Sequence, residues 1–168
     1  RGVPGRGEGT IVAALWREPV AAPLASILLR KRELTAELLD VGKMIEPARA
    51  ARGATRSMPE DVARLREILQ RQGDRALRGE STVEEDAEFH SVLAHAARNR
   101  VVLKVLDVLM DLLRETRVRS LQVEGRLQKS FAGHRRVLEA IRRRDPDAAE
   151  RAVRRHLEEI ESIVMEKL

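Results

Sequence analysis

Three histidines and one aspartate stand where their side chains could bind a metal ion together. The histidines are His90, His134 and His156, and each lies in a separate segment with helical apolar spacing. Asp86 precedes His90 by four residues, so on a helix both side chains lie one turn apart on the same face. Imidazole nitrogens with one carboxylate oxygen suit a divalent metal ion. These residue types predict a divalent metal site, with zinc favoured and nickel or manganese as alternatives.

Each of the three histidines lies near the centre of an apolar stripe, because a helical residue advances by about 100°. The residues around them are Val83, Ala94 and Ala97 for His90; Leu127, Leu138 and Ile141 for His134; and Ala149, Ala152, Ile160 and Ile163 for His156. An apolar stripe faces the protein interior, so we expect three interior imidazoles. His95 lies about 140° away from His90 and faces elsewhere. Helical spacing does not establish that the three converge, and hydrogen-bonded core histidines are the alternative.

The elements that must position these residues are helices. Alternation of apolar residues every three to four positions begins at Leu24, and helix-forming residues dominate the composition. The first helix has Leu34, Leu38, Val41, Ile45 and Ala48 on its predicted inner face and Pro47 as a kink near its end. The pattern predicts an all-α, antiparallel bundle of about six to seven helices.

Capping residues place the later helices. Ser57 with Glu60 and Thr82 with Glu85 have the spacing of capping boxes. The first would open a helix that Gly73 and Gly79 break, and the second a helix that ends near residue 98. Asn99 would cap a helix over about 101–119, with Val102, Leu106, Leu109 and Leu113 as its stripe, and Gly125 would mark the next break. A further helix contains 127–141, and Asp145 followed by Pro146 predicts the last one.

Composition excludes several classes of protein. The chain of 168 residues has no cysteine, which excludes disulfides, thiolate metal sites and cysteine nucleophiles. It has three aromatic residues, too few for stacking single-stranded bases. The longest apolar run, residues 11–16, is too short to span a bilayer, so we expect no membrane partner. The net charge of +5 has its surplus between residues 114 and 156, which is poor evidence for DNA contact by this fragment.

Two motifs carry a family resemblance. Residues 86–90 read D-x-x-F-H, and residues 134–141 read H-x-x-V-L-x-A-I and continue into Asp145, Ala148-Ala149 and His156-Leu157. In this order and spacing they resemble the FCD domain, the C-terminal effector domain of FadR-type regulators in the GntR family of bacterial transcription regulators. Residues 38–47 look like the first helix of that domain.

The resemblance implies a cytoplasmic ligand sensor rather than an enzyme. It implies that Asp86, His90, His134 and His156 bind the metal, and that a small carboxylate effector occupies the open coordination positions. It further implies a homodimer that binds operator DNA through an N-terminal domain. Many relatives carry an arginine where this chain has Gly42, which puts the usual acid-binding geometry in doubt. Arg117 continues the stripe of 102–113 and could supply the effector-binding charge, although a solvated arginine at a helix end is the alternative.

The resemblance also implies a domain organisation. Residues 1–12 would be the remnant of a winged helix-turn-helix wing, residues 13–23 a linker, and residues 24–168 the FCD effector-binding and dimerisation domain. Most of the DNA-binding domain would then precede residue 1.

Two other functions compete with this one. Three histidines and an aspartate could activate water in a helical metalloenzyme. No general acid or base is evident beside the expected ligands, and Glu88 is expected to point outward. The other alternative is a helical interaction module in which the histidines are only structural.

Overall fold

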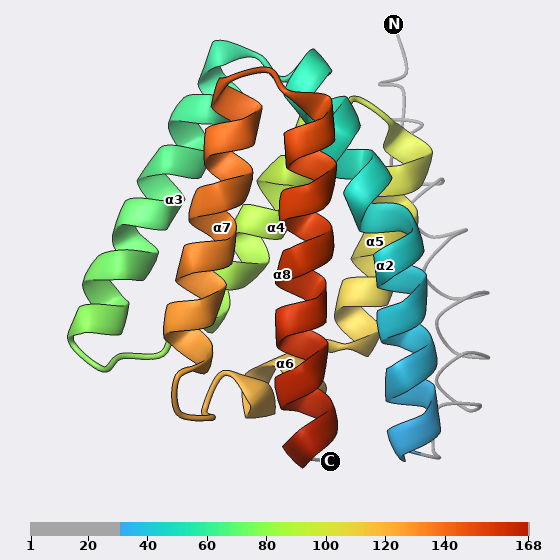
Figure 1. Ribbon diagram of the computed structural model, residues 1–168, viewed down its shortest axis with the longest axis vertical. Helices are drawn as coiled ribbons and strands as arrows, with labels where there is room; N and C mark the ends of the chain where they lie inside the picture. The colour runs from blue at the N-terminus through green and yellow to red at the C-terminus, as the bar shows by residue number, and fades with distance from the viewer. Residues whose placement is uncertain (1–30, 168) are drawn as a thin grey trace, which may run out of the picture.

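Seven α-helices make up most of residues 31–167, the part of the chain that our computed structural model describes (Figure 1). They are α2 (Lys31–Arg56), α3 (Pro59–Leu77), α4 (Val83–Ala96), α5 (Arg100–Leu112), α6 (Arg114–Ser120), α7 (Arg126–Arg142) and α8 (Pro146–Lys167). No strand occurs in this range, so the predicted all-α bundle is confirmed. The expected wing remnant at 1–12 and linker at 13–23 lie outside the described residues.

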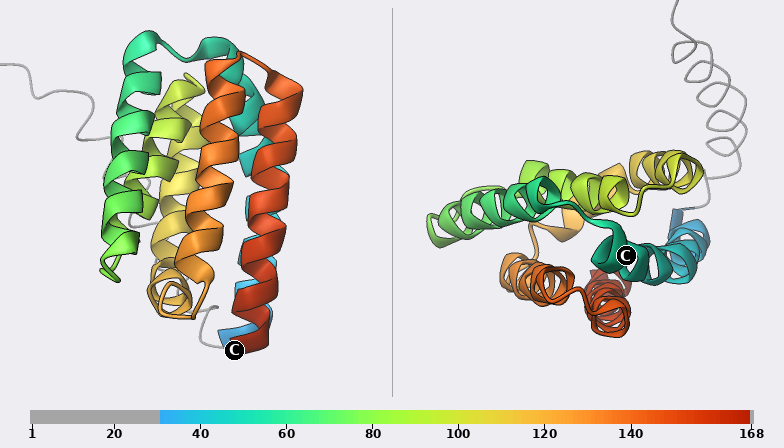
Figure 2. Two further views of the ribbon diagram at one scale, coloured as in Figure 1. Left: turned by 60° about the vertical axis from the view of Figure 1, so that its left-hand side comes forward. Right: turned by 90° about the horizontal axis from the view of Figure 1, so that it is seen from above.

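The long helices pack in two layers that α2 joins. Seen from above in Figure 2, α3, α4 and α5 lie on one side and α7 and α8 on the other. The most extensive contacts join α8 to α2 and to α7, while α3 packs against α4 and α7. Helix α2 also contacts α4 and α5, and the short α6 lies at one end of the bundle (Figure 1). The three helices that carry the histidines, α4, α7 and α8, are thus parts of one packed unit.

Two predicted helix starts are confirmed by their caps. The Asn99 side chain accepts hydrogen bonds from the backbone nitrogens of Val101 and Val102, each at 3.1 Å, at the start of α5. The Asp145 carboxylate accepts one from the nitrogen of Ala148 at 2.9 Å, next to Pro146 at the start of α8. Gly125 adopts a left-handed conformation, with φ +77°, directly before α7, as expected of a break.

The hydrogen bonds expected for the two predicted capping boxes do not form between the predicted residues. Before α3 the backbone nitrogen of Met58 donates to the Asp61 carboxylate at 2.8 Å, so the box begins one residue after Ser57. Thr82 does precede α4, but its buried hydroxyl has no hydrogen bond within residues 31–167, and the Glu85 carboxylate pairs with Arg75 instead. A nearby cation thus outcompetes the local cap.

One predicted helix break is absent, and one break that was not predicted is present. Gly73 lies inside the continuous helix α3 and does not interrupt it. A Cβ there would lie 2.9 Å from the Phe131 ring, so the ring packs directly against the glycine. The helix predicted over 101–119 is two helices, since α5 ends at Leu112 and α6 begins at Arg114. The glycine at 73 therefore serves packing between helices and not chain reversal.

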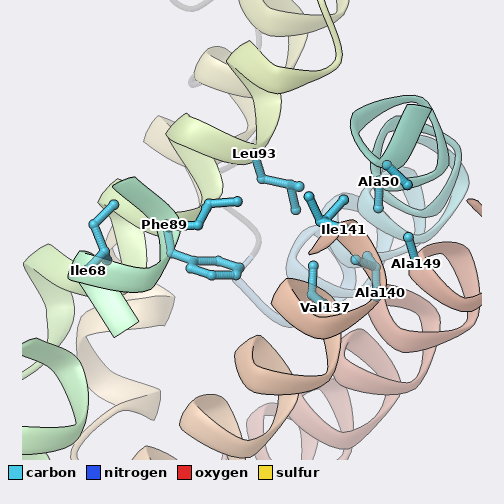
Figure 3. Close-up of a cluster of buried hydrophobic side chains, with 11 residues drawn as sticks. Ala50, Ile68, Phe89, Leu93, Val137, Ala140, Ile141 and Ala149 are labelled. Atoms are coloured by element: carbon cyan, nitrogen blue, oxygen red, sulfur yellow. The ribbon is translucent and has the colours of Figure 1, made fainter. Parts of the chain in front are cut away.

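Buried apolar side chains hold the layers together around the site. Figure 3 shows the main cluster, in which Phe89 and Leu93 of α4 meet Val137 and Ile141 of α7 and Ala50 of α2. A second cluster joins Ala94 to the inner side of α5. Full burial of each large apolar side chain contributes about 1.5–3 kcal/mol, so these contacts fix the relative positions of α4 and α7. In the described residues no helix is long and apolar enough to cross a membrane.

The predicted inner face of α2 is displaced around the helix. Val41 is 38% exposed and Ala48 is exposed, although both were expected inside. The residues that are buried instead include Gly42, Glu46 and Arg49. Burial of a charged pair is tolerated because each member has a partner. The inner face of α2 is therefore partly polar, and it faces the histidines. Pro47 lies inside α2, which continues to Arg56.

Candidate metal centre

The structure brings the three histidines together. His90 comes from α4, His134 from α7 and His156 from α8, and all three are buried. One ring nitrogen of each lies within 4.8 Å of the others. The ring centroids are 5.2 Å apart for His90 and His134, 4.8 Å for His134 and His156, and 5.9 Å for His90 and His156. The convergence that helical spacing left open is thus observed, whereas metal binding itself stays a prediction.

Hydrogen bonding and stacking orient the His134 ring. Its Nδ1 lies 2.9 Å from the amide oxygen of Gln72, and that oxygen can only accept, so Nδ1 donates and Nε2 keeps a lone pair. Nε2 is buried and has no hydrogen-bond partner among the residues that the structure describes. The Phe89 ring stacks on the imidazole at 4.1 Å with an interplanar angle of 10°. This is the arrangement typical of metal-binding histidines, which donate their second ring N–H to a neighbouring acceptor.

Glycine makes room for His156. A Cβ on Gly133 would lie 2.2 Å from the His156 Nδ1 and 2.9 Å from its Cγ. The imidazole therefore lies directly on the backbone of α7, one residue before His134. Within the described part of the chain, the buried Nδ1 of His156 has no hydrogen-bond partner, and neither has the buried Nδ1 of His90. One nitrogen on each of the three rings therefore lacks a hydrogen bond, counting His134 Nε2.

A buried ion pair on α2 supports His90. The Arg49 guanidinium donates to the Glu46 carboxylate and to the backbone carbonyl of His90, both at 3.0 Å. Nδ1 of His90 lies 3.3 Å from Glu46 Oε2. Burial raises the pKa of Glu46, but the adjacent His90 imidazole and the charge of Arg49 outweigh this and lower it to about 2. Glu46 is thus an anion beside the cluster, although the apolar stripe of α2 gave no sign of it.

Asp86 lies beside the histidines with its carboxylate already engaged. Ser130 donates to Oδ1 at 2.7 Å, and Arg117 forms an ion pair with Oδ2. Oδ1 is 3.6 Å from His134 Nε2. Burial raises the pKa of Asp86, but the charge of Arg117 holds it well below its usual value. The aspartate is therefore ionised next to the cluster.

The donors fit a divalent metal ion. Burial lowers the pKa of His134 to about 3 and also lowers that of His156 well below its ordinary value. Neutral imidazoles are the form that binds metals. Unpartnered buried nitrogens are rare in proteins, and a metal ion would satisfy unpartnered ring nitrogens such as those of this cluster. His90, His134 and His156 would hold the ion, with Asp86 adjacent, and the ion would supply a positive charge.

A cavity of about 50 Å³ adjoins the cluster. Its walls come from six helices and from Leu113. The lining residues are Leu39, Gly42, Lys43, Glu46, Asp86, His90, Met110, Leu113, Arg117, Arg126, His156, Leu157, Ile160 and Glu161. Arg117, the predicted effector-binding residue, lines this cavity and is not a solvated end residue, but it is paired with Asp86. Lys43 also lines this cavity, with its ammonium 2.8 Å from Glu161. Its position one residue after Gly42 makes it a poor substitute for the arginine that many relatives carry there.

Sequence patterns did not predict several residues of the site, although two of these residues have a spacing that indicates a role. Gln72 follows Leu69 by three residues and so continues the apolar stripe of α3, where a polar residue needs a partner. Ser130 precedes His134 by four residues on α7, which places both on one face. For Arg126 no sequence signal was available.

Removal of the Gln72 acceptor should weaken metal binding. We expect Gln72→Leu to lower zinc affinity about 10- to 100-fold, because His134 Nδ1 loses its acceptor and the ring its fixed orientation. Competition with a coloured chelator measures this affinity. Gln70→Leu, at an exposed position of the same helix, is the control and should bind zinc normally. Equal zinc affinities for the two variants would contradict the orienting role of Gln72.

The metal-free chain should lose stability in mild acid. The unfolded state takes up a proton on each histidine near pH 6.5, whereas the folded state holds the pKa of His134 down to about 3. Stability is therefore complete above pH 6.5 and falls as the pH drops, by about 2 kcal/mol from His134 alone at pH 5. Urea unfolding of chelator-treated protein at pH 7.5 and pH 5 measures this loss. His95→Ala should keep the full loss and His134→Ala should reduce it; a flat profile would refute the buried neutral state.

Comparison with known proteins agrees with the fold. The FCD domain family matches residues 37–159. The HTH-type transcriptional regulator LutR of Bacillus subtilis is 27% identical over 95% of this chain and 75% of its own length. The HTH-type transcriptional repressor NanR of an Enterobacter species is 32% identical, over 66% of this chain and 42% of its own. A solved structure, Streptococcus agalactiae GntR, superposes with a TM-score of 0.68 at 26% identity and covers 84% of this chain and 63% of that one.

The chain thus spans between about two fifths and three quarters of these relatives. The family match covers most of its length, includes Asp86 and all three clustered histidines, and agrees with the motifs at 86–90 and 134–141. The chain therefore belongs to the FCD domain family, as its sequence motifs predicted.

Proposed function

We propose that this chain is the effector-sensing domain of a GntR-family transcription regulator acting in the cytoplasm. It binds one divalent metal ion through His90, His134 and His156, and a small carboxylate effector binds in the adjoining cavity. The observation that carries the proposal is the cluster of three buried histidines, in which one nitrogen of each ring lacks a hydrogen-bond partner among the described residues. The names of the relatives, two HTH-type regulators among them, support the regulatory role.

Residues of the chain hold the three histidines in place beside the cavity in which an acid would bind. Gln72 fixes the His134 ring, Arg49 fixes the backbone of α4, and Gly133 lets His156 reach the cluster. The metal ion would supply the positive charge that attracts a carboxylate. Because the wall of the cavity comes from α2, α4, α5, α6, α7 and α8, a ligand there contacts most of the bundle at once. In a homodimer, such a ligand would shift the population of domain arrangements and hence the fit to operator half-sites.

The metalloenzyme alternative has less support. The two carboxylates beside the cluster are Glu46 and Asp86, and each forms an ion pair, with Arg49 and Arg117. The pKa of each is lowered despite burial, so neither carries a proton to donate near neutral pH. A general acid among the described residues would have to come from elsewhere in the bundle.

Metal analysis tests the metal part of this proposal. Protein purified without a nickel column should contain about one divalent ion per chain, and its removal with a chelator should lower the melting temperature. A chain that takes up no ion even after incubation with zinc, nickel or manganese would refute metal binding.

DNA binding by the full-length regulator tests the sensing part. A panel of small carboxylic acids should contain one that changes operator affinity, and chelation should abolish its effect. No change across a broad panel would refute the sensing role. Turnover of any acid in the panel would instead favour the metalloenzyme.

A further inference from the structure

Arg126 is a buried cation without a counter-ion. It is the first residue of α7, directly after Gly125, and is only 2% exposed. Its Nε and Nη1 atoms are buried without a hydrogen-bond partner, and among the described residues no carboxylate forms an ion pair with it. A guanidinium stays charged in proteins, and an unpaired buried charge is costly. The cavity that Arg126 lines therefore offers this guanidinium no paired anion among the described residues.

No carboxylate of the cavity wall can provide that anion, because each is engaged elsewhere. Glu46 pairs with Arg49, Asp86 with Arg117 and Glu161 with Lys43. Burial lowers the pKa of Arg126, Asp86 opposes this, and Arg117 adds repulsion. A metal ion on three neutral histidines would be a second positive centre in the same cavity, because the adjacent Glu46 and Asp86 carboxylates are already paired with arginines.

We propose that Arg126 is the second anchor of the effector and that the effector is a short-chain dicarboxylate. This rests on the proposed function: one carboxylate lies at the metal ion, and the other accepts the forked hydrogen bonds of Arg126. A monocarboxylate would leave one of the two positive centres unpaired. The small cavity, with Leu113, Leu157 and Ile160 in its wall, favours an unbranched chain of about three or four carbons.

Calorimetric titration of the zinc-loaded chain with acids of matched length tests this. Malonate against propionate and succinate against butyrate differ in the second carboxylate alone. In at least one pair we expect the diacid to bind at least 10-fold more tightly. Arg126→Gln should abolish that preference and leave the zinc content and the affinity for monoacids unchanged. Arg119→Gln is the control, because Arg119 is exposed and its one ion pair among the described residues is with Glu115.

The melting temperature of the ligand-free protein is a second measurement, and it separates an unpaired anchor from an arginine that only stabilises the fold. Arg126→Met removes an uncompensated buried charge, so the melting temperature of the metal-free, acid-free protein should rise or stay the same. Equal binding of monoacids and diacids would overturn the proposal, as would diacid preference that survives Arg126→Gln. A clear fall in melting temperature for Arg126→Met would also overturn it. If zinc does not bind the wild-type chain, the proposed function fails, and the melting temperature still decides whether Arg126 is an unpaired anchor.

Discussion

His134→Ala is expected to lower zinc affinity by more than about 100-fold, whereas His95→Ala leaves it unchanged. His134 is the central member of the cluster: its ring is nearest to that of His156, its Nε2 is unpartnered, and Asp86 Oδ1 is 3.6 Å away. His95 is exposed, and its Nδ1 lies 2.9 Å from the backbone carbonyl of Ser91. The two substitutions are identical in chemistry and differ only in position.

Zinc affinity in this experiment is measured by competition with a chelator, and helix content by circular dichroism. Loss of a fully buried ring that stacks on Phe89 could also destabilise the fold. His134→Gln therefore serves as a second variant, because it keeps most of the volume while it removes the imidazole. Equal zinc affinity for the His134 and His95 variants would overturn the assignment of the cluster as the metal site.

The positions of the helices could be predicted from the sequence because apolar spacing and caps are local. Asn99 and Asp145 cap helices as expected, and the three histidines lie on the buried sides of their helices. Helical spacing gives an angle around an axis, however, and no distance between axes. The meeting of α4, α7 and α8 at one point depends on how the cores of different helices pack.

The buried polar residues of the site could not be predicted, because apolar periodicity identifies buried apolar side chains and says nothing about which polar side chains are buried. On α2 the apolar stripe led to Val41 and Ala48, which are exposed, while Glu46 and Arg49 are buried as a pair. The charges of this pair are satisfied by contacts with each other and with α4, which is far away in the sequence. Arg126 is the extreme case, since its environment exists only after α7 has packed.

Gly133→Ala should remove metal binding through a single methyl group. The Cβ would lie 2.2 Å from His156 Nδ1, far closer than nonbonded atoms approach, and the crowded atoms belong to a buried ring with little space to move. Either the His156 ring turns away or α8 moves from α7. In both cases one of three ligands leaves the cluster, so we expect zinc affinity to fall by more than about 100-fold.

Gly53→Ala is the matched control for this substitution. Gly53 also lies inside a helix, but a Cβ there would meet its nearest neighbours, Ile141 and Leu93, at 3.4 Å. Alanine favours the helix by about 0.8–1.0 kcal/mol over glycine, so this variant should be as stable as the parent or more so, with normal zinc affinity.

A double-mutant cycle separates the clash from a general defect of α7. If the methyl group acts only on the His156 ring, then Gly133→Ala combined with His156→Ala should regain the stability that the clash removes and still bind zinc poorly. The two substitutions should therefore be far from additive in both unfolding free energy and zinc affinity. Additive effects would mean that position 133 acts on the helix and not on His156. Wild-type zinc affinity in Gly133→Ala would mean that His156 is not a ligand, which leaves the cluster with two histidines and no closed metal site.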